Sequence, residues 1–289
     1  MSHATDTTGT VYLVGAGPGD PELLTVKARR LLDEAEVVLR DNLVGEAIVE
    51  SLPDRTAVEN VGKRPGGDRT PQAEINDRLV RHARAGRDVV RLKGGDPTLF
   101  GRGGEEAEHL AHHGVPFEFV PGVTSAIAGP SAGGIPATHR DHASALAVVT
   151  GHEDPTKPDS AIDWESLANI VSAGGTLVVL MGVGRLPDNV SALKSHGVGD
   201  ETPVAMVERA TLDDERTVIG TLDTIVDRAR RVGIEPPAVT VVGEVVNVRE
   251  TVAHCLGSGA AGESGAPGEW SPAASAASPA EEEIEVNQQ

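Results

Sequence analysis

The chain has 289 residues, 39% of them apolar, which is enough to bury a substantial core and suits two modest domains. Its 44 acidic residues outnumber 25 basic ones, and this net charge of −19 argues against nucleic acid or an anionic membrane as partner. A lone cysteine, Cys255, excludes an internal disulfide and a cysteine-based zinc cluster; because no run approaches the about 18 apolar residues of a membrane span, we expect a cytoplasmic protein.

Three short apolar runs in the first half of the chain end in loops rich in glycine and proline. The runs are VYLV (Val11–Val14), VVRLK (Val89–Lys93) and FEFV (Phe117–Val120). Such runs are typical of buried parallel strands, and in open α/β sheets ligands bind beyond the carboxyl ends of the strands. We therefore predict a large ligand that is held mainly by the backbone of these loops.

The first of these loops, GAGPGD, matches a dinucleotide-binding fingerprint only in part. The G-x-G-x-x-G pattern would need glycine where Asp20 stands, and no Lys-Ser/Thr pair follows the loop as it does in a P-loop. A nicotinamide-dependent oxidoreductase is therefore a disfavoured alternative.

The first half alternates strands with helices from Gly9 to about Arg140, which predicts a mostly parallel sheet covered on both faces. Apolar residues near helical spacing predict a helix over residues 21–36, and a strand follows at Val37–Leu39. Glycine, proline and serine are dense over residues 129–136, which predicts a connector to a second domain.

The second half predicts another strand-rich α/β unit. Its expected strands cover residues 145–152, 176–184, 203–210, 217–222 and 238–246. Beyond Leu256 the chain is rich in Gly, Ala, Ser, Pro and Glu and has no Lys or Arg, a composition that does not fold. We therefore expect an N-terminal α/β domain over residues 9–140, a C-terminal α/β domain over residues 141–256 and a disordered acidic tail over residues 257–289.

Four longer motifs surround these loops. They are GAGPGDPELLTVKARRLLDEAEVVLRDNLV (Gly15–Val44), VGKRPG (Val61–Gly66), RLKGGDPTLFGRGGEEAE (Arg91–Glu108) and VPGVTSAIAGPSAGGIPATHRD (Val120–Asp141). Together they resemble the uroporphyrinogen-III C-methyltransferases, and the similarity covers about residues 10 to 256. The resemblance implies a tetrapyrrole methylase fold: two α/β domains, a mostly parallel first sheet, a mixed second sheet and an active cleft between them.

That family uses S-adenosylmethionine to methylate a tetrapyrrole on the route to sirohaem and cobalamin. The resemblance therefore implies transfer of two methyl groups to carbons 2 and 7 of uroporphyrinogen III, giving precorrin-2 and S-adenosylhomocysteine. It also implies a homodimer.

The resemblance further implies which residues contact the cofactor. These are Pro18, Gly94, Gly95, Asp96, Leu99, Thr124, Ser125, Met181 and Ala210. Taken without the family, Gly94-Gly95 would be a tight turn and Met181 a buried strand residue. Asp96 favours a ligand, because a carboxylate beside a proline at the end of a strand has no obvious packing role and can accept hydrogen bonds.

A porphyrinogen carbon can attack a sulfonium methyl group without an enzyme nucleophile, so one general base suffices to remove the ring proton. The resemblance places the proton acceptor at Asp41 and the proposed donor at Lys63, although Asp41 would also suit a turn cap and Lys63 a substrate anchor. We assign the binding of substrate carboxylates to Arg64, Arg91, Arg102, His139 and Arg140.

Two further features have simpler explanations. His109, His112 and His113 have a helical spacing that could bind metal, but the last turn of a helix favours histidine anyway, so we expect no metal site. The acidic residues are spread along the chain rather than gathered in one block, which leads us to the hypothesis of a salt-loving source.

Other functions stay open at this point. A related methylase could act on a later corrin precursor, on diphthamide in a translation factor, or on ribosomal RNA. RNA is disfavoured by the charge and by an aromatic content of 2%, which leaves few surfaces for base stacking. A non-catalytic interaction protein that acts through its acidic tail is the remaining alternative, and binding of S-adenosylhomocysteine separates it from the methylases.

Overall fold

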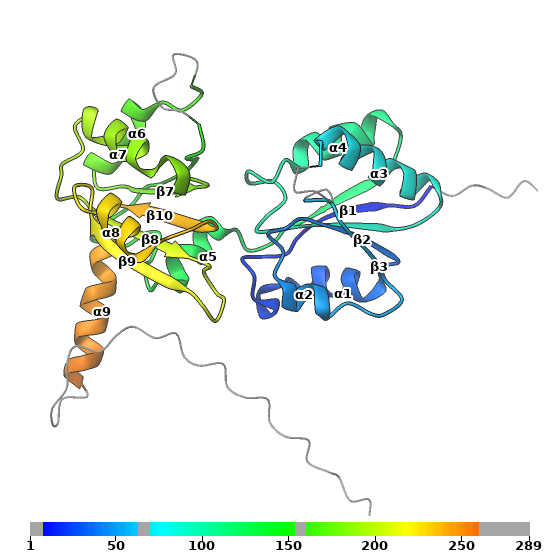
Figure 1. Ribbon diagram of the computed structural model, residues 1–289, viewed down its shortest axis with the longest axis horizontal. Helices are drawn as coiled ribbons and strands as arrows, with labels where there is room; N and C mark the ends of the chain where they lie inside the picture. The colour runs from blue at the N-terminus through cyan, green and yellow to red at the C-terminus, as the bar shows by residue number, and fades with distance from the viewer. Residues whose placement is uncertain (1–7, 63–69, 154–159, 260–289) are drawn as a thin grey trace, which may run out of the picture.

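The computed structural model describes residues 8–62, 70–153 and 160–259, with only the backbone given for 256–259. These residues form two α/β lobes side by side, joined by the chain that leads into helix α5 (Ser125–Ala132) (Figure 1). Lys63 and Arg64 of the predicted site, and residues 260–289 of the predicted tail, lie outside the described residues.

The first lobe contains a five-stranded sheet in the order β3-β2-β4-β1-β5. Its strands are β1 (Val11–Gly15), β2 (Val37–Arg40), β3 (Ala57–Asn60), β4 (Val89–Lys93) and β5 (Phe117–Val120). Every neighbouring pair is parallel, so the carboxyl ends of all five strands lie at one edge. The predicted parallel sheet is confirmed.

Helices cover both faces of this sheet. Val14, Val38 and Leu92 pack on one face beneath α1 (Val26–Glu34) and α2 (Glu46–Glu50). Leu13, Leu39 and other residues of the opposite face pack beneath α3 (Gln72–Arg84) and α4 (Gly103–His112). Because both faces of the sheet are covered, the central strands β1, β2 and β4 are mostly apolar on both sides.

The predicted helix over residues 21–36 is wrong in its first part. A short 3-10 turn, η1 (Pro21–Leu23), precedes α1, which begins only after Thr25. The carboxylate of Asp20 accepts a hydrogen bond from the Glu22 amide at 2.8 Å, and the Thr25 hydroxyl accepts one from the Ala28 amide at 3.2 Å. Two successive side-chain caps therefore start two separate elements.

The connector predicted over residues 129–136 is also partly wrong, because α5 extends to Ala132 and includes Pro130. A Cβ added to Gly129 would lie 2.9 Å from Val239 Cγ2, and one added to Gly133, just after the helix, would lie 2.7 Å from Val207 Cγ2. Glycine in this segment thus permits close packing on the second sheet, which local sequence preference does not reveal.

The second lobe contains a mixed five-stranded sheet in the order β6-β7-β10-β8-β9. Its strands are β6 (Leu146–Thr150), β7 (Thr176–Leu180), β8 (Pro203–Glu208), β9 (Arg216–Thr221) and β10 (Ala238–Val242). Only β6 and β7 pair in parallel; the other neighbours are antiparallel. This confirms the predicted mixed sheet.

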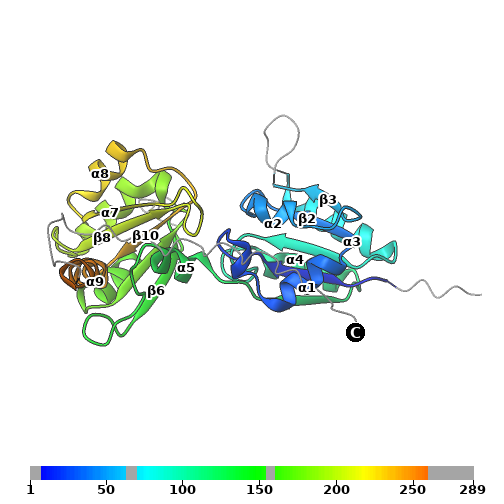
Figure 2. The ribbon, with the colours of Figure 1, turned by 90° about the horizontal axis from the view of Figure 1, so that it is seen from below.

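One face of the second sheet packs beneath α6 (Trp164–Ser172), α7 (Leu186–Ser195), which follows the 3-10 turn η2 (Val183–Arg185), and α8 (Ile225–Val232). The other face packs on α5 and the start of α9 (Val246–Gly259). Figure 2 shows α5 between the two lobes and α9 on the outer side of the second lobe.

The C-terminal boundary differs from the prediction. The last strand ends at Val242 rather than Val246, and α9 runs to Gly259, three residues into the segment expected to be tail.

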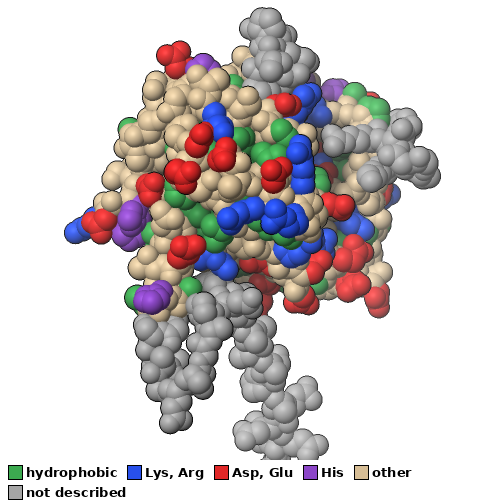
Figure 3. Space-filling model, turned by 60° about the vertical axis from the view of Figure 1, so that its left-hand side comes forward, with side chains coloured by type: hydrophobic (Ala, Val, Ile, Leu, Met, Phe, Trp, Pro, Cys, Tyr) green, Lys and Arg blue, Asp and Glu red, His purple; other side chains and the backbone are tan. Residues whose placement is uncertain are grey.

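No helix in the described part of the chain combines the length and apolar character needed to cross a membrane. Acidic and basic side chains are interspersed over the face shown in Figure 3, rather than separated into blocks.

Candidate functional site

Four loops meet at the carboxyl edge of the first sheet, and we call them together the loop junction. They are residues 15–20 after β1, 41–45 after β2, 94–99 after β4 and 121–125 after β5. The Gly17 amide donates to Gly95 O at 3.1 Å, and the Gly95 amide donates to Gly17 O at 2.7 Å. The three loops that the sequence singled out are therefore in one place, with the loop after β2 beside them.

Close backbone approach explains the glycines of the loop junction. A Cβ added to Gly122 would lie 2.3 Å from Gly95 O, and one added to Gly94 would lie 2.9 Å from Leu43 Cβ. Gly95 has a φ of 67°, which favours glycine on its own account. Any side chain at Gly122 or Gly94 would push two loops apart.

Asp96 has a structural role that the sequence did not suggest. Its Oδ1 accepts hydrogen bonds from the Thr98 amide at 2.8 Å and the Thr98 hydroxyl at 2.5 Å, and its Oδ2 accepts one from the Gly122 amide at 3.1 Å. Nearby, the Thr124 hydroxyl accepts a bond from the Ala126 amide at 3.3 Å and so caps α5. Asp96 thus ties the loop after β4 to the loop after β5.

Residues of the second lobe contact the loop junction. A Cβ added to Gly19 would lie 2.8 Å from Leu212 Cδ2, and Leu99 packs against a core that includes Val178 and Val239. Because Leu180 pairs with Val239 and Glu208 with Ala238, the residues that follow β7 and β8 lie at the same end of the second sheet. Met181 and Ala210 are therefore at one end of that sheet.

Five non-glycine residues in the described part of the chain have positive φ, and all lie in the segments that follow β4, β7 and β8. They are Phe100, Arg102, Met181, Arg209 and Thr211, with φ between 48° and 70°. Such backbone conformations cost about 1–3 kcal/mol each and often occur at binding sites. Thr211 Oγ1 is also buried without a hydrogen-bond partner among the described residues.

Together these features fit S-adenosylmethionine. Glycine turns, hydroxyl groups and exposed backbone suit its adenosine and amino-acid ends, and the orphaned Thr211 hydroxyl would gain a partner from a polar ligand. The side chain of Met181 is about half exposed at the end of β7, where an apolar group can lie against a ligand.

Asp41 follows β2 directly, and its carboxylate pairs with Arg91 on β4, the strand that lies beside β2 in the sheet. Arg91 Nη2 donates to Asp41 Oδ1 at 2.5 Å, and Lys93 Nζ lies 3.8 Å from Asp41 Oδ2. The Asp41 side chain keeps 28% of its surface exposed, whereas the Arg91 side chain keeps 2%. The carboxylate therefore reaches the surface while its partners lie in the core.

Glu106 of α4 completes this cluster and was missed by the sequence analysis. It is fully buried, and its Oε1 accepts hydrogen bonds from Arg91 Nε at 3.0 Å and from Lys93 Nζ at 3.0 Å. The signal was available: two cations in a buried apolar strand require buried carboxylates. Glu106 precedes the buried Ala107 and lies one turn before the buried Leu110.

The charges of this cluster shift the pKa values of its cations in opposite directions. Burial acts to lower the pKa of Arg91, but the carboxylates of Asp41 and Glu106 outweigh it and hold that pKa above its ordinary value. Burial, reinforced by the positive charge of Arg91, lowers the pKa of Lys93 in spite of the same two carboxylates. The Arg91 guanidinium therefore keeps its positive charge in the core.

The assignment of Arg91 to substrate carboxylates is wrong. Its guanidinium donates to Glu106, Asp41 and the carbonyls of Leu39 and Leu92, and it is inaccessible from outside.

Arg102, by contrast, is exposed at the start of α4. It donates to Glu105 at 2.9 and 2.6 Å, and this hydrogen bond lowers the pKa of the Glu105 carboxyl.

His139 and Arg140 are not brought to the loop junction in this chain. The His139 amide donates to Ala143 O at 3.0 Å, which forms a small hairpin, and Arg140 lines a cavity with Gly174 and Gly175. That cavity lies at the amino-terminal end of β7, whereas Met181 follows its carboxyl end, about 20 Å away at the rise of an extended strand.

Two of the three predicted histidines have local roles at the end of α4. The Nδ1 atoms of His112 and His113 lie 2.7 and 2.8 Å from the carbonyl oxygens of Glu108 and His109. Two imidazoles therefore satisfy carbonyl groups in the last turn of the helix.

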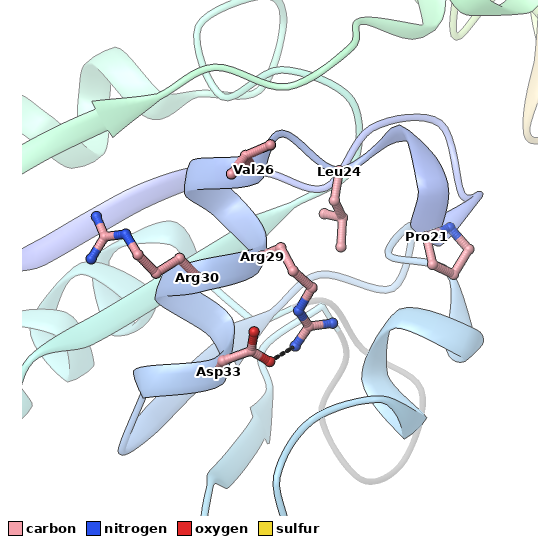
Figure 4. Close-up of a pocket in the computed structure, with 6 residues that line it drawn as sticks. All are labelled: Pro21, Leu24, Val26, Arg29, Arg30 and Asp33. Carbon is pink, nitrogen blue, oxygen red and sulfur yellow. Dashed lines mark hydrogen bonds and ion pairs between the residues drawn. The ribbon is translucent and has the colours of Figure 1, made fainter. Parts of the chain in front are cut away.

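A separate cavity lies over the start of α1 and contains none of the predicted site residues (Figure 4). Pro21, Leu24 and Val26 supply its apolar wall, and Arg29 and Arg30 its cations. Arg29 Nη2 donates to Asp33 at 2.6 Å and Arg30 Nη1 to Glu34 at 3.1 Å. Carboxylates of the same helix thus already neutralise both cations.

Comparison with known proteins agrees with this geometry. Residues 10–226 match the family model described as "Tetrapyrrole (Corrin/Porphyrin) Methylases". An S-adenosyl-L-methionine-dependent uroporphyrinogen III methyltransferase of Methanosarcina barkeri is 54% identical over 242 residues, which cover 84% of this chain and 94% of the relative.

Two solved structures are also similar. The uroporphyrin-III C-methyl transferase of Thermus thermophilus in complex with S-adenosyl homocysteine is 47% identical, with a TM-score of 0.71 over 83% of this chain and 100% of the other. A cobalt precorrin-4 methyltransferase of cobalamin biosynthesis is 28% identical, with a TM-score of 0.74 over 85% and 98% of the two chains.

Proposed function

The chain belongs to the tetrapyrrole (corrin/porphyrin) methylase family, and from that premise we propose that it is an S-adenosylmethionine-dependent uroporphyrinogen-III C-methyltransferase of sirohaem and cobalamin biosynthesis. The observation that carries the proposal is the loop junction itself, where the glycine loops after β1, β4 and β5 meet beside the ion-paired carboxylate of Asp41. The relatives that act on uroporphyrinogen III share about half of their residues with this chain.

A later corrin precursor is the second candidate substrate. It is favoured by the fold similarity to the cobalt precorrin-4 methyltransferase, which has the higher TM-score of the two structures, 0.74 against 0.71. The fold is common to both activities, so sequence identity decides: 28% for the corrin enzyme against 47% for the uroporphyrin enzyme.

The proposed cofactor residues are Pro18, Gly94, Gly95, Asp96, Leu99, Thr124, Ser125, Met181 and Ala210, to which the unpartnered hydroxyl of Thr211 is added. S-adenosylmethionine, when bound, supplies an electrophilic methyl group on a positively charged sulfur. The loop backbone holds and orients this ligand, and Asp96 acts by fixing two of the loops. Orientation of the two reactants supplies much of the rate in a displacement of this kind.

Asp41 is the proposed proton acceptor. A pyrrole carbon of the substrate would gain the methyl group as the methyl–sulfur bond breaks and S-adenosylhomocysteine leaves, and the ring would give up one proton for each methyl group gained. The carboxylate of Asp41 lies in the loop after β2, and its second oxygen, Oδ2, lies 3.8 Å from Lys93 Nζ. That oxygen is the one able to take the proton.

Arg102, Lys63 and Arg64 are the proposed anchors of the substrate carboxylates. Arg102 is exposed beside the loop junction, which supports the assignment, and Lys63 and Arg64 rest on the resemblance. His139 and Arg140 also stay as substrate residues on the resemblance alone.

We extend the proposal to a cytoplasmic homodimer. The exposed side chains of Phe119 on β5 and Ile127 on α5 are suited to a subunit contact.

The experiment that tests the function has two arms. The purified chain is incubated without oxygen with labelled S-adenosylmethionine and either uroporphyrinogen III or a later corrin precursor. Transfer of label to uroporphyrinogen III alone supports the proposal, and transfer to the corrin precursor alone supports the second candidate.

A further inference from the structure

Glu106 is a charged residue in the core of the first lobe. It has no exposed surface, and besides Arg91 and Lys93 it accepts a hydrogen bond from Gln72 Nε2 at 3.1 Å. All three donors share Oε1, while Oε2 is buried without a hydrogen-bond partner among the described residues. A carboxylate this deeply buried depends on the positive charges of Arg91 and Lys93 to offset its loss of hydration.

The four charged side chains of the cluster are together neutral. Arg91 and Lys93 bring two positive charges and Asp41 and Glu106 two negative ones, and three of the four side chains are almost fully buried. If Glu106 were absent, two buried cations would face the single carboxylate of Asp41. Both would then compete for the oxygen that the proposed reaction requires to be free.

We propose that Glu106 is a positioning residue for Asp41: it holds Arg91 and Lys93 from the core side, so that Asp41 binds one cation through Oδ1 and keeps Oδ2 available at the loop junction. This inference rests on the proposed function, because it assigns Glu106 a task in proton transfer. Glu106 itself contacts no substrate.

The other charged groups around the cluster are paired with one another in the described part of the chain. On α4, Arg102 pairs with Glu105, and His109 lies 3.5 Å from Asp77 of α3. The remaining pairs nearby are Arg78 with Glu59 and Glu74, His82 with Glu59, and Arg40 with Glu46. Asp41 therefore responds first to the charge balance of Arg91, Lys93 and Glu106.

The Glu106→Gln variant tests the proposal, because it keeps the size and an acceptor oxygen but removes the negative charge. The uncompensated positive charge stabilises the Asp41 anion and makes it a weaker base. We expect kcat to fall by about tenfold or more and the acid limb of the kcat–pH profile to move down by about one pH unit. The Kd for S-adenosylhomocysteine stays within about twofold, since Glu106 is not in the cofactor loops.

A double variant separates charge from structure. Lys93→Met/Glu106→Gln again leaves one cation and one anion, Arg91 and Asp41, so the acid limb should return to its wild-type position. If Glu106→Gln alone does not fold, the double variant still measures how the charge balance around Asp41 affects the rate. Glu108→Gln, on the exposed side of the same helix, is the matched control and leaves both rate and profile unchanged.

The carboxyl titration of Asp41, followed by carbon NMR in aspartate-labelled protein and assigned with Asp41→Asn, gives a readout that does not need turnover. Its midpoint moves down in Glu106→Gln and returns in the double variant. An unmoved midpoint with a lowered kcat would show that Glu106 is only structural, and would overturn the proposal. A wild-type protein that fails to methylate uroporphyrinogen III would reject the proposed function instead, and leave this titration as a separate result.

Discussion

Asp41 Oδ1 and Arg91 Nη2 lie 2.5 Å apart, and this ion pair joins the end of β2 to the middle of β4. Arg91 lies in the core, so the pair is fixed from the inside and the carboxylate is presented outward. A buried cation with several acceptors leaves little freedom to the side chain that it binds. The base of the proposed reaction is thus oriented before any substrate arrives.

Replacing Asp41 by Asn removes the basic oxygen and keeps the shape of the side chain. We expect methyl transfer to fall by about 100-fold or more, the range for loss of a general base, with little change in the Kd for S-adenosylhomocysteine. Single-turnover rates and calorimetry measure the two quantities. Asp54→Asn on the exposed surface is the control. Cofactor binding that weakens while turnover of the bound complex stays normal would make Asp41 a structural or binding residue.

Replacing Asp96 by Ala removes three hydrogen bonds that hold the loops after β4 and β5. S-adenosylhomocysteine binding should weaken by about 1–3 kcal/mol, because the loops lose their fixed spacing. Thr98→Val removes only the hydroxyl donor and should cost less. Equal affinity in wild type and Asp96→Ala would show that the loops keep their positions without this carboxylate.

High salt should stabilise the protein. With 44 acids against 25 basic residues, repulsion between carboxylates is strongest in dilute buffer. The Tm should therefore rise between dilute buffer and molar potassium chloride. Equal values of Tm would argue against adaptation to high ionic strength.

Truncation after Gly259 should leave the enzyme intact. The removed segment carries six acidic residues and no lysine or arginine, and none of the proposed site residues belongs to it. Turnover and cofactor affinity of the truncated protein should stay within about twofold of the full chain. A large loss of turnover would assign the segment a role at the site.

Four strands of the first sheet and the five of the second could be predicted from the sequence, because β-branched apolar runs have few other structures. β3 was not predicted, since its run AVEN is short and half polar. The environment of Arg91 could not be predicted. In the sequence, Arg91 stands near Lys93 and a loop, as a surface cation would. The counter-charge of Arg91 is Glu106, 15 residues further along the chain, which reaches Arg91 only because α4 packs on the sheet. In the sequence, Glu106 lies in the acidic run EEAE, which is typical of an exposed helix face.

Contacts between loops could not be predicted for a similar reason. Asp96 stays a proposed cofactor residue, but the hydrogen bond that it accepts from the Gly122 amide, 26 residues away on the loop after another strand, has no signal in the sequence. His139 and Arg140 follow the glycine-rich segment directly, which suggested the cleft, yet the hairpin with Ala143 turns them to the far end of the second sheet. Pairings over such separations depend on tertiary structure, which local preferences do not encode.

The most direct test of the function is to count the methyl groups that the chain adds. Uroporphyrinogen III is supplied without oxygen together with S-adenosylmethionine labelled in its methyl group, and the product is analysed by mass spectrometry. We predict a product with two labelled methyl groups, on carbons 2 and 7, and two equivalents of S-adenosylhomocysteine. An unchanged uroporphyrinogen III, with active cofactor binding and label transferred to a later corrin precursor, would contradict the proposed function.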